Sequence, residues 1–294
     1  MRVGVAGLGR MGAAIAARLK EAGNAVVVWN RSPEKMKPLV AEGCVAATSP
    51  RDLVGRSDII VTILTDATAI EQMFGGAEGL LAGDVSGKLF IEMSTVQPAT
   101  QIQLAGLVRA KGAGFVECPV GGTIGPARQG KLIGMLGGEP GDIAKARPVI
   151  DQMCRRADHW GDVGAGSSMK LAINLPLAVY FEALGEAYAM VKHLGIDTAR
   201  FIELLSDTSG GPNVLKGRGP VFAKALATGE TGAPTFNVDG IRKDMRTMIA
   251  EAHDLGYSGL PVVESALAVF DQVAAKGMGD FDCAILPTYL PGQK

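Results

Sequence analysis

A lysine and an asparagine one helical turn apart form the pair of residues in this sequence best suited to proton transfer. Lys170 and Asn174 lie four positions apart, so a helix would place both on one face. Their neighbours are mostly apolar, and apolar surroundings lower the pKa of a lysine toward the range that acid–base catalysis needs. A solvent-exposed helix lysine is the simpler interpretation. The position just past an expected domain junction, where ligand clefts form, favours the chemical role.

Six residues near the N-terminus have the spacing of a dinucleotide-binding turn. Gly7, Leu8, Gly9, Arg10, Met11 and Gly12 follow the apolar run Val3–Ala6 and begin a helical pattern over Met11–Ala22. In a GxGxxG turn the first glycine permits a tight bend, the second admits a pyrophosphate close to the backbone, and the third lets helix and strand pack closely. The N–H groups at the helix N-terminus would then face the phosphates. The alternative is a glycine-rich turn that binds nothing.

The end of the second apolar run indicates which nicotinamide cofactor the turn would bind. An NAD site usually carries a carboxylate about 20 residues after the glycines, where it accepts a hydrogen bond from the ribose 2′-hydroxyl. Here Trp29 is followed by Asn30, Arg31 and Ser32, and the first carboxylate is Glu34. A guanidinium can bind a 2′-phosphate through paired, charge-assisted hydrogen bonds. We therefore expect NADP rather than NAD, bound by Arg31 with Asn30 and Ser32 as neutral donors, unless Arg31 is only an exposed loop residue.

A second glycine-containing turn, Pro119–Ala127, is a candidate for binding the acid group of a substrate. Gly121, Gly122 and Thr123 come shortly after the apolar run Phe115–Cys118. Successive backbone N–H groups at the end of a strand can form a nest that receives a carboxylate. A plain turn would have the same composition, and the sequence does not separate the two interpretations.

Short apolar runs alternate with helical patterns in the first half of the chain, which predicts βαβ units on a largely parallel sheet. After about Gly164 the strand pattern disappears and long helical patterns follow. We expect an α/β domain over residues 1–163 and an all-α domain over residues 164–294, the second beginning with a long helix. The expected strands are Val3–Ala6, Ala25–Trp29, Ile59–Leu64, Leu89–Glu92, Phe115–Cys118 and Leu132–Leu136. The expected helices of the second half are Ser168–Leu194, Thr198–Asp207, Val238–Leu255 and Pro261–Ala275, with breaks at Gly195, Gly210–Pro212, Gly217–Pro220 and Gly259–Pro261.

Composition and charge argue against several classes of function. The chain has 294 residues, 47% of them hydrophobic, and a formal net charge of −1, so a sizeable core is expected but no electrostatic attraction to nucleic acid or membrane. The stretch Leu171–Met190 is the most apolar, yet it contains Pro176 and two glutamates, which favours a buried helix over a membrane span. The four cysteines are scattered and do not cluster with histidines, so we expect no metal site and small buried thiols. With no signal peptide visible, a soluble cytoplasmic protein is expected.

Five motifs, in order, resemble those of the β-hydroxyacid dehydrogenase family, which includes 3-hydroxyisobutyrate dehydrogenase, tartronate semialdehyde reductase and the glyoxylate/succinic semialdehyde reductases. The family pattern is GxGxMG, MSTVxP, PVSGG, GxxxKxxxN and a later KD pair seven residues after a phenylalanine. The corresponding residues here are Gly7–Gly12, Met93–Pro98, Pro119–Thr123, Gly166–Asn174, and Phe236 with Lys243-Asp244. The likeness extends over nearly the whole chain.

The resemblance implies a Rossmann-like domain to about residue 163, an all-helical domain after it, and a small hydroxy acid or semialdehyde as substrate. It implies that Thr95 lies beside the nicotinamide and that the turn at 121–123 holds the substrate carboxylate. Lys170 would be the catalytic acid/base with Asn174 beside it, and Lys243 would close over the cofactor. We also expect Leu64 and Thr65, at the end of the run Ile59–Leu64, to contact the cofactor. Family members are commonly dimers or tetramers, so a homodimer or homotetramer is expected.

One departure from the family affects the substrate. Where the family has Ser-Gly-Gly, this chain has Gly121-Gly122-Thr123, so the serine hydroxyl that would help hold a carboxylate is absent. Thr123 could compensate, or the substrate could lack the usual acid group or carry a bulkier one. An imine reductase of the same architecture is one alternative, although such enzymes often lack the lysine. A nucleotide-binding scaffold without catalysis is another, although it would be expected to lose the Lys170–Asn174 pair.

Overall fold

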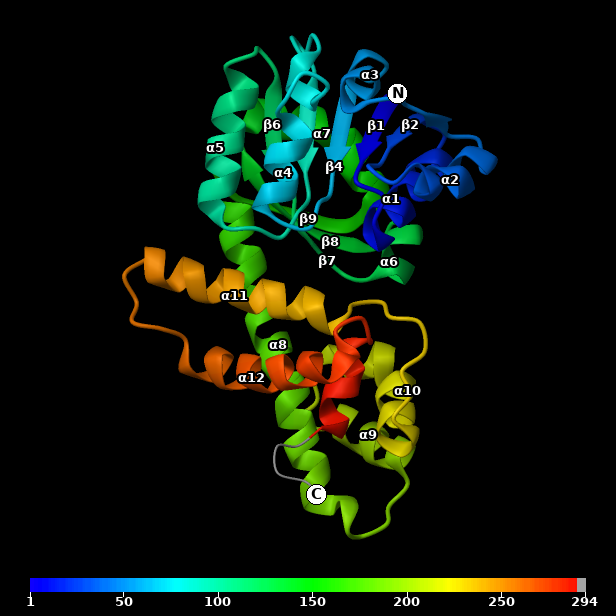
Figure 1. Cartoon of the computed structure of the whole chain (residues 1–294), viewed down its shortest axis with the longest axis vertical. Coiled ribbons are helices and arrows are strands. Elements are labelled where there is room, and N and C mark those ends of the chain that lie inside the picture. The colour runs from blue at the N-terminus through cyan, green and yellow to red at the C-terminus, as the bar shows by residue number, and fades with distance from the viewer. Residues whose placement is uncertain (290–294) are drawn as a thin grey trace. The chain divides into compact units, whose positions relative to one another are not determined.

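The β-branched runs of the first half form one sheet of nine strands within residues 1–289, the part of the chain that the computed structural model describes (Figure 1). Each of the six runs expected from the sequence lies in or overlaps a strand. The strands are β1 (Arg2–Ala6), β2 (Ala25–Trp29), β3 (Val45–Ala46), β4 (Ile59–Thr62), β5 (Leu89–Glu92), β6 (Gly114–Glu117), β7 (Val120–Gly121), β8 (Leu132–Gly138) and β9 (Cys154–Gly161).

The strand order fixes where a ligand can approach the sheet. The order is β3-β2-β1-β4-β5-β6-β8-β7, with β9 paired to β8. All pairs from β3 to β6 are parallel, whereas β8 runs antiparallel to β6 and β7. The chain winds outward from β1 first in one direction and then, from β4, in the other. The carboxyl ends of β1 and β4 therefore flank the switch point of a doubly wound sheet.

Helices alternate with the strands of the first unit and follow one another in the second. The chain divides into two compact units after Leu171, a boundary that lies inside α8. The helices of the first unit are α1 (Arg10–Glu21), α2 (Lys37–Ala41), α3 (Pro50–Gly55), α4 (Ala67–Phe74), α5 (Pro98–Arg109), α6 (Ile124–Arg128) and α7 (Pro140–Met153). The remaining helices are α8 (Ala165–Lys192), α9 (Thr198–Ser206), α10 (Asn213–Thr228), α11 (Val238–Asp254) and α12 (Pro261–Val273). The protein thus has an N-terminal Rossmann-like sheet with helices, followed by a helical C-terminal part.

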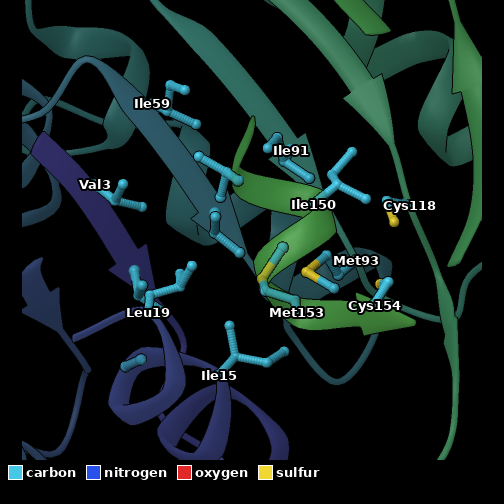
Figure 2. Close-up of a cluster of buried hydrophobic side chains, with 14 of the residues drawn as sticks. Val3, Ile15, Leu19, Ile59, Ile91, Met93, Cys118, Ile150, Met153 and Cys154 are labelled. Atoms are coloured by element: carbon cyan, nitrogen blue, oxygen red, sulfur yellow. The ribbon is translucent and has the colours of Figure 1, made fainter. Parts of the chain in front are cut away.

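Two apolar clusters cover the sheet of the first unit, one with each set of helices. The first contains Ile15 of α1, Ile150 of α7 and strand residues such as Ile91, all labelled in Figure 2. The second packs Phe74 of α4 against Phe90 of β5, with ring centroids 5.5 Å apart. Successive strand residues thus point to opposite faces and both faces are buried, as expected for a parallel sheet covered by helices.

The helical unit has its own core, centred on aromatic side chains. Phe181 of α8 lies 5.7 Å from Phe222 of α10 and 6.3 Å from Phe270 of α12, measured between ring centroids. Each of these rings is at most 1% exposed. Large fully buried rings dominate core energetics, so this contact ties three helices together.

The structure differs from the sequence prediction at one expected helix break and at three strands, β3, β7 and β9, which the six expected runs did not include. The expected break at Gly217–Pro220 is wrong, because α10 continues through it with Pro220 on its exposed side. Burial of Phe222 and its neighbours outweighs the weak helix propensity of these residues, since packing routinely overrides propensity. Strand β9 was missed because its sequence, CRRADHWG, has no apolar run. It forms by pairing with β8.

Candidate active site

The glycine-rich turn lies at the switch point of the sheet. It follows β1 directly and leads into α1, whose first residue is Arg10. Gly9 precedes the helix and has no side chain with which to cap it. The first N–H groups of α1 and the positive end of its dipole are therefore available to an anion at the switch point, outside the carboxyl ends of β1 and β4.

The three glycines of the turn differ in what a side chain at each position would meet. Gly7 has a φ of +94°, and a Cβ there would overlap the carbonyl oxygen of Ile63. A Cβ on Gly12 would overlap the carbonyl oxygen of Gly7. A Cβ on Gly9 would meet nothing within 4 Å. Packing therefore demands the first and third glycines, whereas the second leaves open space where a pyrophosphate would fit.

Asn30 ties the second strand to the glycine-rich turn, a role that the sequence analysis did not anticipate. Its Oδ1 accepts a hydrogen bond of 2.8 Å from the Leu8 backbone N–H, and its Nδ2 donates to the Ser32 carbonyl oxygen at 3.2 Å. Arg31, the next residue, is exposed. The asparagine thus stabilises the turn itself, while the guanidinium lies at the surface beyond the end of β2.

A second link joins the loops that follow β4 and β5. The Leu64 backbone N–H donates to Ser94 Oγ at 2.7 Å, and the Ser94 backbone N–H donates to Glu92 Oε2 at 3.0 Å. The Ser94 hydroxyl also donates to the other oxygen of Glu92. Leu64 and Thr95 were expected from the sequence to lie at the cofactor. No role was expected for Ser94, which joins the Leu64 loop to the end of β5. The sequence signal that could have identified Ser94 was its position two residues after the buried strand β5.

The turn at 121–123 needs only one of its glycines for packing. Gly122 has a φ of +123°, and a Cβ there would lie 2.9 Å from Leu132 Cδ2. A Cβ on Gly121 would find its nearest neighbour, Met135 Cε, at 3.7 Å, an ordinary contact distance. Thr123 precedes the short helix α6. The missing side chain at Gly121 is therefore not imposed by its surroundings.

Lys170 lies close to the start of α8 and is 7% exposed. The residues just before it are held by Glu117 at the end of β6, whose carboxylate accepts hydrogen bonds from Gly164 N at 2.5 Å, Gly166 N at 2.8 Å and Ser167 Oγ at 2.5 Å. A Cβ on Gly166 would overlap the Met135 carbonyl oxygen. A Cβ on Gly121 would also have Met135 as its nearest neighbour, so the start of the lysine helix and the 121–123 turn both lie close to this residue of β8.

Two buried carboxylates lie side by side beneath these loops. Glu92 and Glu117 are register partners across β5 and β6, and both are 0% exposed. Burial raises the pKa of Glu92 to about 7, against the opposing effect of hydrogen bonds from Ser94 and Gln101, and the charge of Glu117 adds to the rise. Burial also raises the pKa of Glu117, opposed by its bonds to the start of α8. Both groups bind protons more tightly than an exposed glutamate.

In the helical unit, Asn174 and Lys243 both contact one buried aspartate. Asn174 Nδ2 donates to Asp244 Oδ2 at 3.3 Å, and Lys243 Nζ lies 2.6 Å from Asp244 Oδ1. Asp244 is 4% exposed. From the sequence, Asp244 was expected only as the aspartate of the Lys243-Asp244 motif, with no role of its own. The sequence signal that could have identified Asp244 is its charge, because a charged residue is rare on the buried face of a helix.

The structure brings the expected residues together in two groups within the first unit. The first group surrounds the switch point and comprises Gly7, Leu8, Gly9, Arg10, Met11, Gly12, Asn30, Arg31, Ser32, Leu64, Thr65 and Thr95. The second comprises Gly121, Gly122, Thr123 and Lys170. Asn174 and Lys243 belong to the helical unit. Within residues 1–289 no cluster of three or more potential metal ligands is found, and no helix is long and apolar enough to cross a bilayer.

Two family models match the chain. Residues 2–161 match the family described as the NAD binding domain of 6-phosphogluconate dehydrogenase. Residues 164–289 match the family described as NAD-binding of NADP-dependent 3-hydroxyisobutyrate dehydrogenase. Together the two models account for both units of the structure.

Individual relatives are similar over almost their full length. The chain is 30% identical to glyoxylate/succinic semialdehyde reductase 1 of Arabidopsis thaliana over 282 residues, which is 96% of each protein. It is 34% identical to 3-hydroxyisobutyrate dehydrogenase of Pseudomonas aeruginosa over 250 residues, 84% of this chain and 83% of that protein. The crystal structure of 3-hydroxyisobutyrate dehydrogenase from Salmonella typhimurium has a TM-score of 0.86 at 26% identity, covering 98% of this chain and 99% of that one.

Proposed function

The chain belongs to the β-hydroxyacid dehydrogenase family of oxidoreductases, and from that premise we propose that it is an NADPH-dependent reductase of a small aldehyde or keto acid. The observation that carries the proposal is the position of Lys170. The lysine lies on a helix whose start is bonded to the end of β6, in the same unit as the dinucleotide turn. A proton donor and a cofactor turn on one sheet edge are what carbonyl reduction requires.

The residues around the switch point fit a dinucleotide with a 2′-phosphate. The first turn of α1 would hold the pyrophosphate over the space left by Gly9. Arg31 is exposed beside the end of β2, with the uncharged Asn30 and Ser32 next to it, so it would bind the 2′-phosphate. The bound cofactor would supply the hydride for the substrate carbonyl. Leu64, Thr65 and Thr95, on the loops after β4 and β5, would flank it, and Lys243 would cover it from the helical unit.

Lys170 would act as the general acid of the reduction. Its ammonium group would give a proton to the carbonyl oxygen of the substrate as that oxygen gains negative charge. Asn174, one helical turn further along α8 and held by Asp244, would fix the orientation of the substrate oxygen. Backbone N–H groups of Gly122 and Thr123 would bind the acid group at the other end of the substrate. In the oxidative direction Lys170 would accept the proton instead.

Gly121 leaves imine reduction as a second candidate. The position lacks the hydroxyl that would help to bind a carboxylate, and its surroundings do not forbid a side chain. A substrate without an acid group, or with a bulkier one, would use the free space.

The exposed apolar side chains of Met190, Leu194 and Leu204 on α8, α9 and the segment between them support a homodimer or homotetramer.

The test is NADPH oxidation by the purified protein with glyoxylate, succinic semialdehyde, tartronate semialdehyde, methylmalonate semialdehyde and a cyclic imine, repeated with NADH. We expect turnover of an aldehyde acid, faster with NADPH. Replacement of Lys170 by alanine should lower kcat by about 10²–10⁴-fold, because a positioned general acid contributes that much. A K170A variant with near-native kcat would remove the lysine from the mechanism. Turnover of the imine alone would select the second candidate, and NADPH binding without any turnover would indicate a scaffold.

A further inference from the structure

The two buried glutamates at the carboxyl ends of β5 and β6 have no place in the chemistry described above. They are register partners on one face of the sheet, and neither is exposed. A buried carboxylate is unfavourable unless hydrogen bonds satisfy it, and two adjacent ones also repel each other when both are ionised. The fold nevertheless keeps both, and each accepts hydrogen bonds from a different set of groups.

Glu117 is bonded to the segment that begins the lysine helix. One of its oxygens accepts from Gly164 N and Gly166 N, and the other accepts from Ser167 Oγ. On β8, Gly137 makes room for this carboxylate, because a Cβ there would overlap Glu117 Oε1. The carboxylate thus sets the position and rotation of the first turn of α8. Lys170 lies within one turn of Ser167 on the same helix.

Glu92 is bonded to a different segment. It accepts from the Ser94 N–H and hydroxyl and from the amide of Gln101 on α5. The Ser94 hydroxyl, oriented in this way, accepts from Leu64 N at 2.7 Å. Glu92 therefore links the loops after β4 and β5 to each other and to α5. The two carboxylates are neighbours, but their hydrogen bonds lead to different segments of the chain.

We propose that Glu117 and Glu92 are positioning residues for two separate halves of the reaction: Glu117 places Lys170 through the start of α8, and Glu92 places the cofactor loops through Ser94 and Leu64. The inference rests on the proposed function in taking Lys170 as the proton donor and the Leu64 loop as a cofactor contact. A displacement of about 1 Å at a reacting group can cost about 100-fold in rate, so small shifts of either segment would be measurable.

The experiment compares Glu117→Gln with Ser94→Ala by two measurements: the Kd for NADPH from its fluorescence, and the single-turnover rate of NADPH oxidation at saturating cofactor. Glu117→Gln keeps the size of the side chain but replaces one acceptor oxygen with an N–H donor. We expect it to lower the single-turnover rate by about 10- to 100-fold and to change the Kd far less. Ser94→Ala should raise the Kd by about 10-fold, the upper range for a lost hydrogen bond, with the smaller effect on the rate.

Ser57→Ala is the matched control for Ser94→Ala, because Ser57 lies in the same unit and is as buried as Ser94. Its hydroxyl donates to the carbonyl oxygen of Leu53 in α3, away from the loops after β4 and β5. Ser57→Ala should lower the melting temperature without a selective change in either the Kd for NADPH or the single-turnover rate. If Glu117→Gln and Ser94→Ala both shift Kd and rate in equal proportion, the glutamates are structural only and the inference is overturned. Should the wild type reduce no aldehyde acid or imine, the proposed function fails. Amide hydrogen exchange then still tests the inference: unchanged exchange over 164–171 in Glu117→Gln, or unchanged NADPH affinity in Ser94→Ala, would overturn it.

Discussion

The two glycine-containing turns of the first unit differ in what their glycines are for. In the N-terminal turn, Gly7 and Gly12 are so tightly packed against backbone that no side chain fits, and only Gly9 faces open space. In the 121–123 turn, Gly122 is packed and Gly121 is not. A packed glycine serves the fold, whereas an unpacked glycine leaves room that a ligand can use. The surroundings of each glycine in the structure therefore distinguish glycines needed for packing from glycines that leave space for a ligand, which the sequence alone does not.

The largest expected effect comes from replacing a packed glycine and an unpacked glycine of the N-terminal turn with alanine and comparing the two variants. Gly12→Ala forces a Cβ into the Gly7 carbonyl oxygen, so we expect a loss of about 4 kcal/mol or more in the free energy of unfolding. Gly9→Ala meets no protein atom, so it should unfold near the wild-type midpoint while its Kd for NADPH rises by at least about 10-fold. Urea unfolding and NADPH titration of both variants measure this. Equal stability losses in the two variants would remove the distinction between packed and open glycines.

The two buried glutamates, Glu92 and Glu117, give the next largest effect, because their protonation makes stability depend on pH. Because the pKa of Glu92 is raised from 4.5 to about 7 in the folded protein, the native state retains a proton that the unfolded chain releases. The contribution of this group to stability is therefore complete below the unfolded value and is lost as the pH rises through about 7, a difference of roughly 3 kcal/mol. Glu117 acts in the same direction.

Glu92→Gln removes this titration while Glu117 remains. Unfolding free energies of the variant between about pH 5 and about pH 8 should fall less steeply than those of the wild type. Parallel curves for the two proteins would show that Glu92 keeps an ordinary pKa in the fold.

The smallest effect on stability, and the sharpest on specificity, is expected at Gly121. A serine there would place its Cβ at ordinary contact distance from Met135, so we expect a change of less than about 1 kcal/mol in unfolding free energy. The new hydroxyl would face the proposed acid-binding turn and should lower KM for glyoxylate relative to bulkier aldehyde acids. Steady-state kinetics on the substrate panel measure the ratio. Large destabilisation of Gly121→Ser would mean that this glycine, too, serves packing.

Much of the fold follows from local pattern. The alternation of apolar runs with helical patterns predicted the parallel part of the sheet, and the comparisons and the structure confirm the Rossmann-like and helical parts. The pattern failed where packing outweighs propensity, as in α10 with its Pro220, and where a strand has no apolar run, as in β9. The roles assigned to Lys170 and Asn174 stay predictions until the kinetics are measured.

Three features of the candidate site can be predicted from local spacing alone: the glycine-rich turn, the lack of a carboxylate next to Arg31, and the four-residue spacing of Lys170 and Asn174. Three further features appear only in the three-dimensional structure: Glu92 and Glu117 are neighbours across β5 and β6, Ser94 joins two loops, and Gly121 has space beside it. These features arise from strand register and packing between segments distant in the chain. No local spacing encodes which strands become neighbours, and that pairing alone brings such groups into contact.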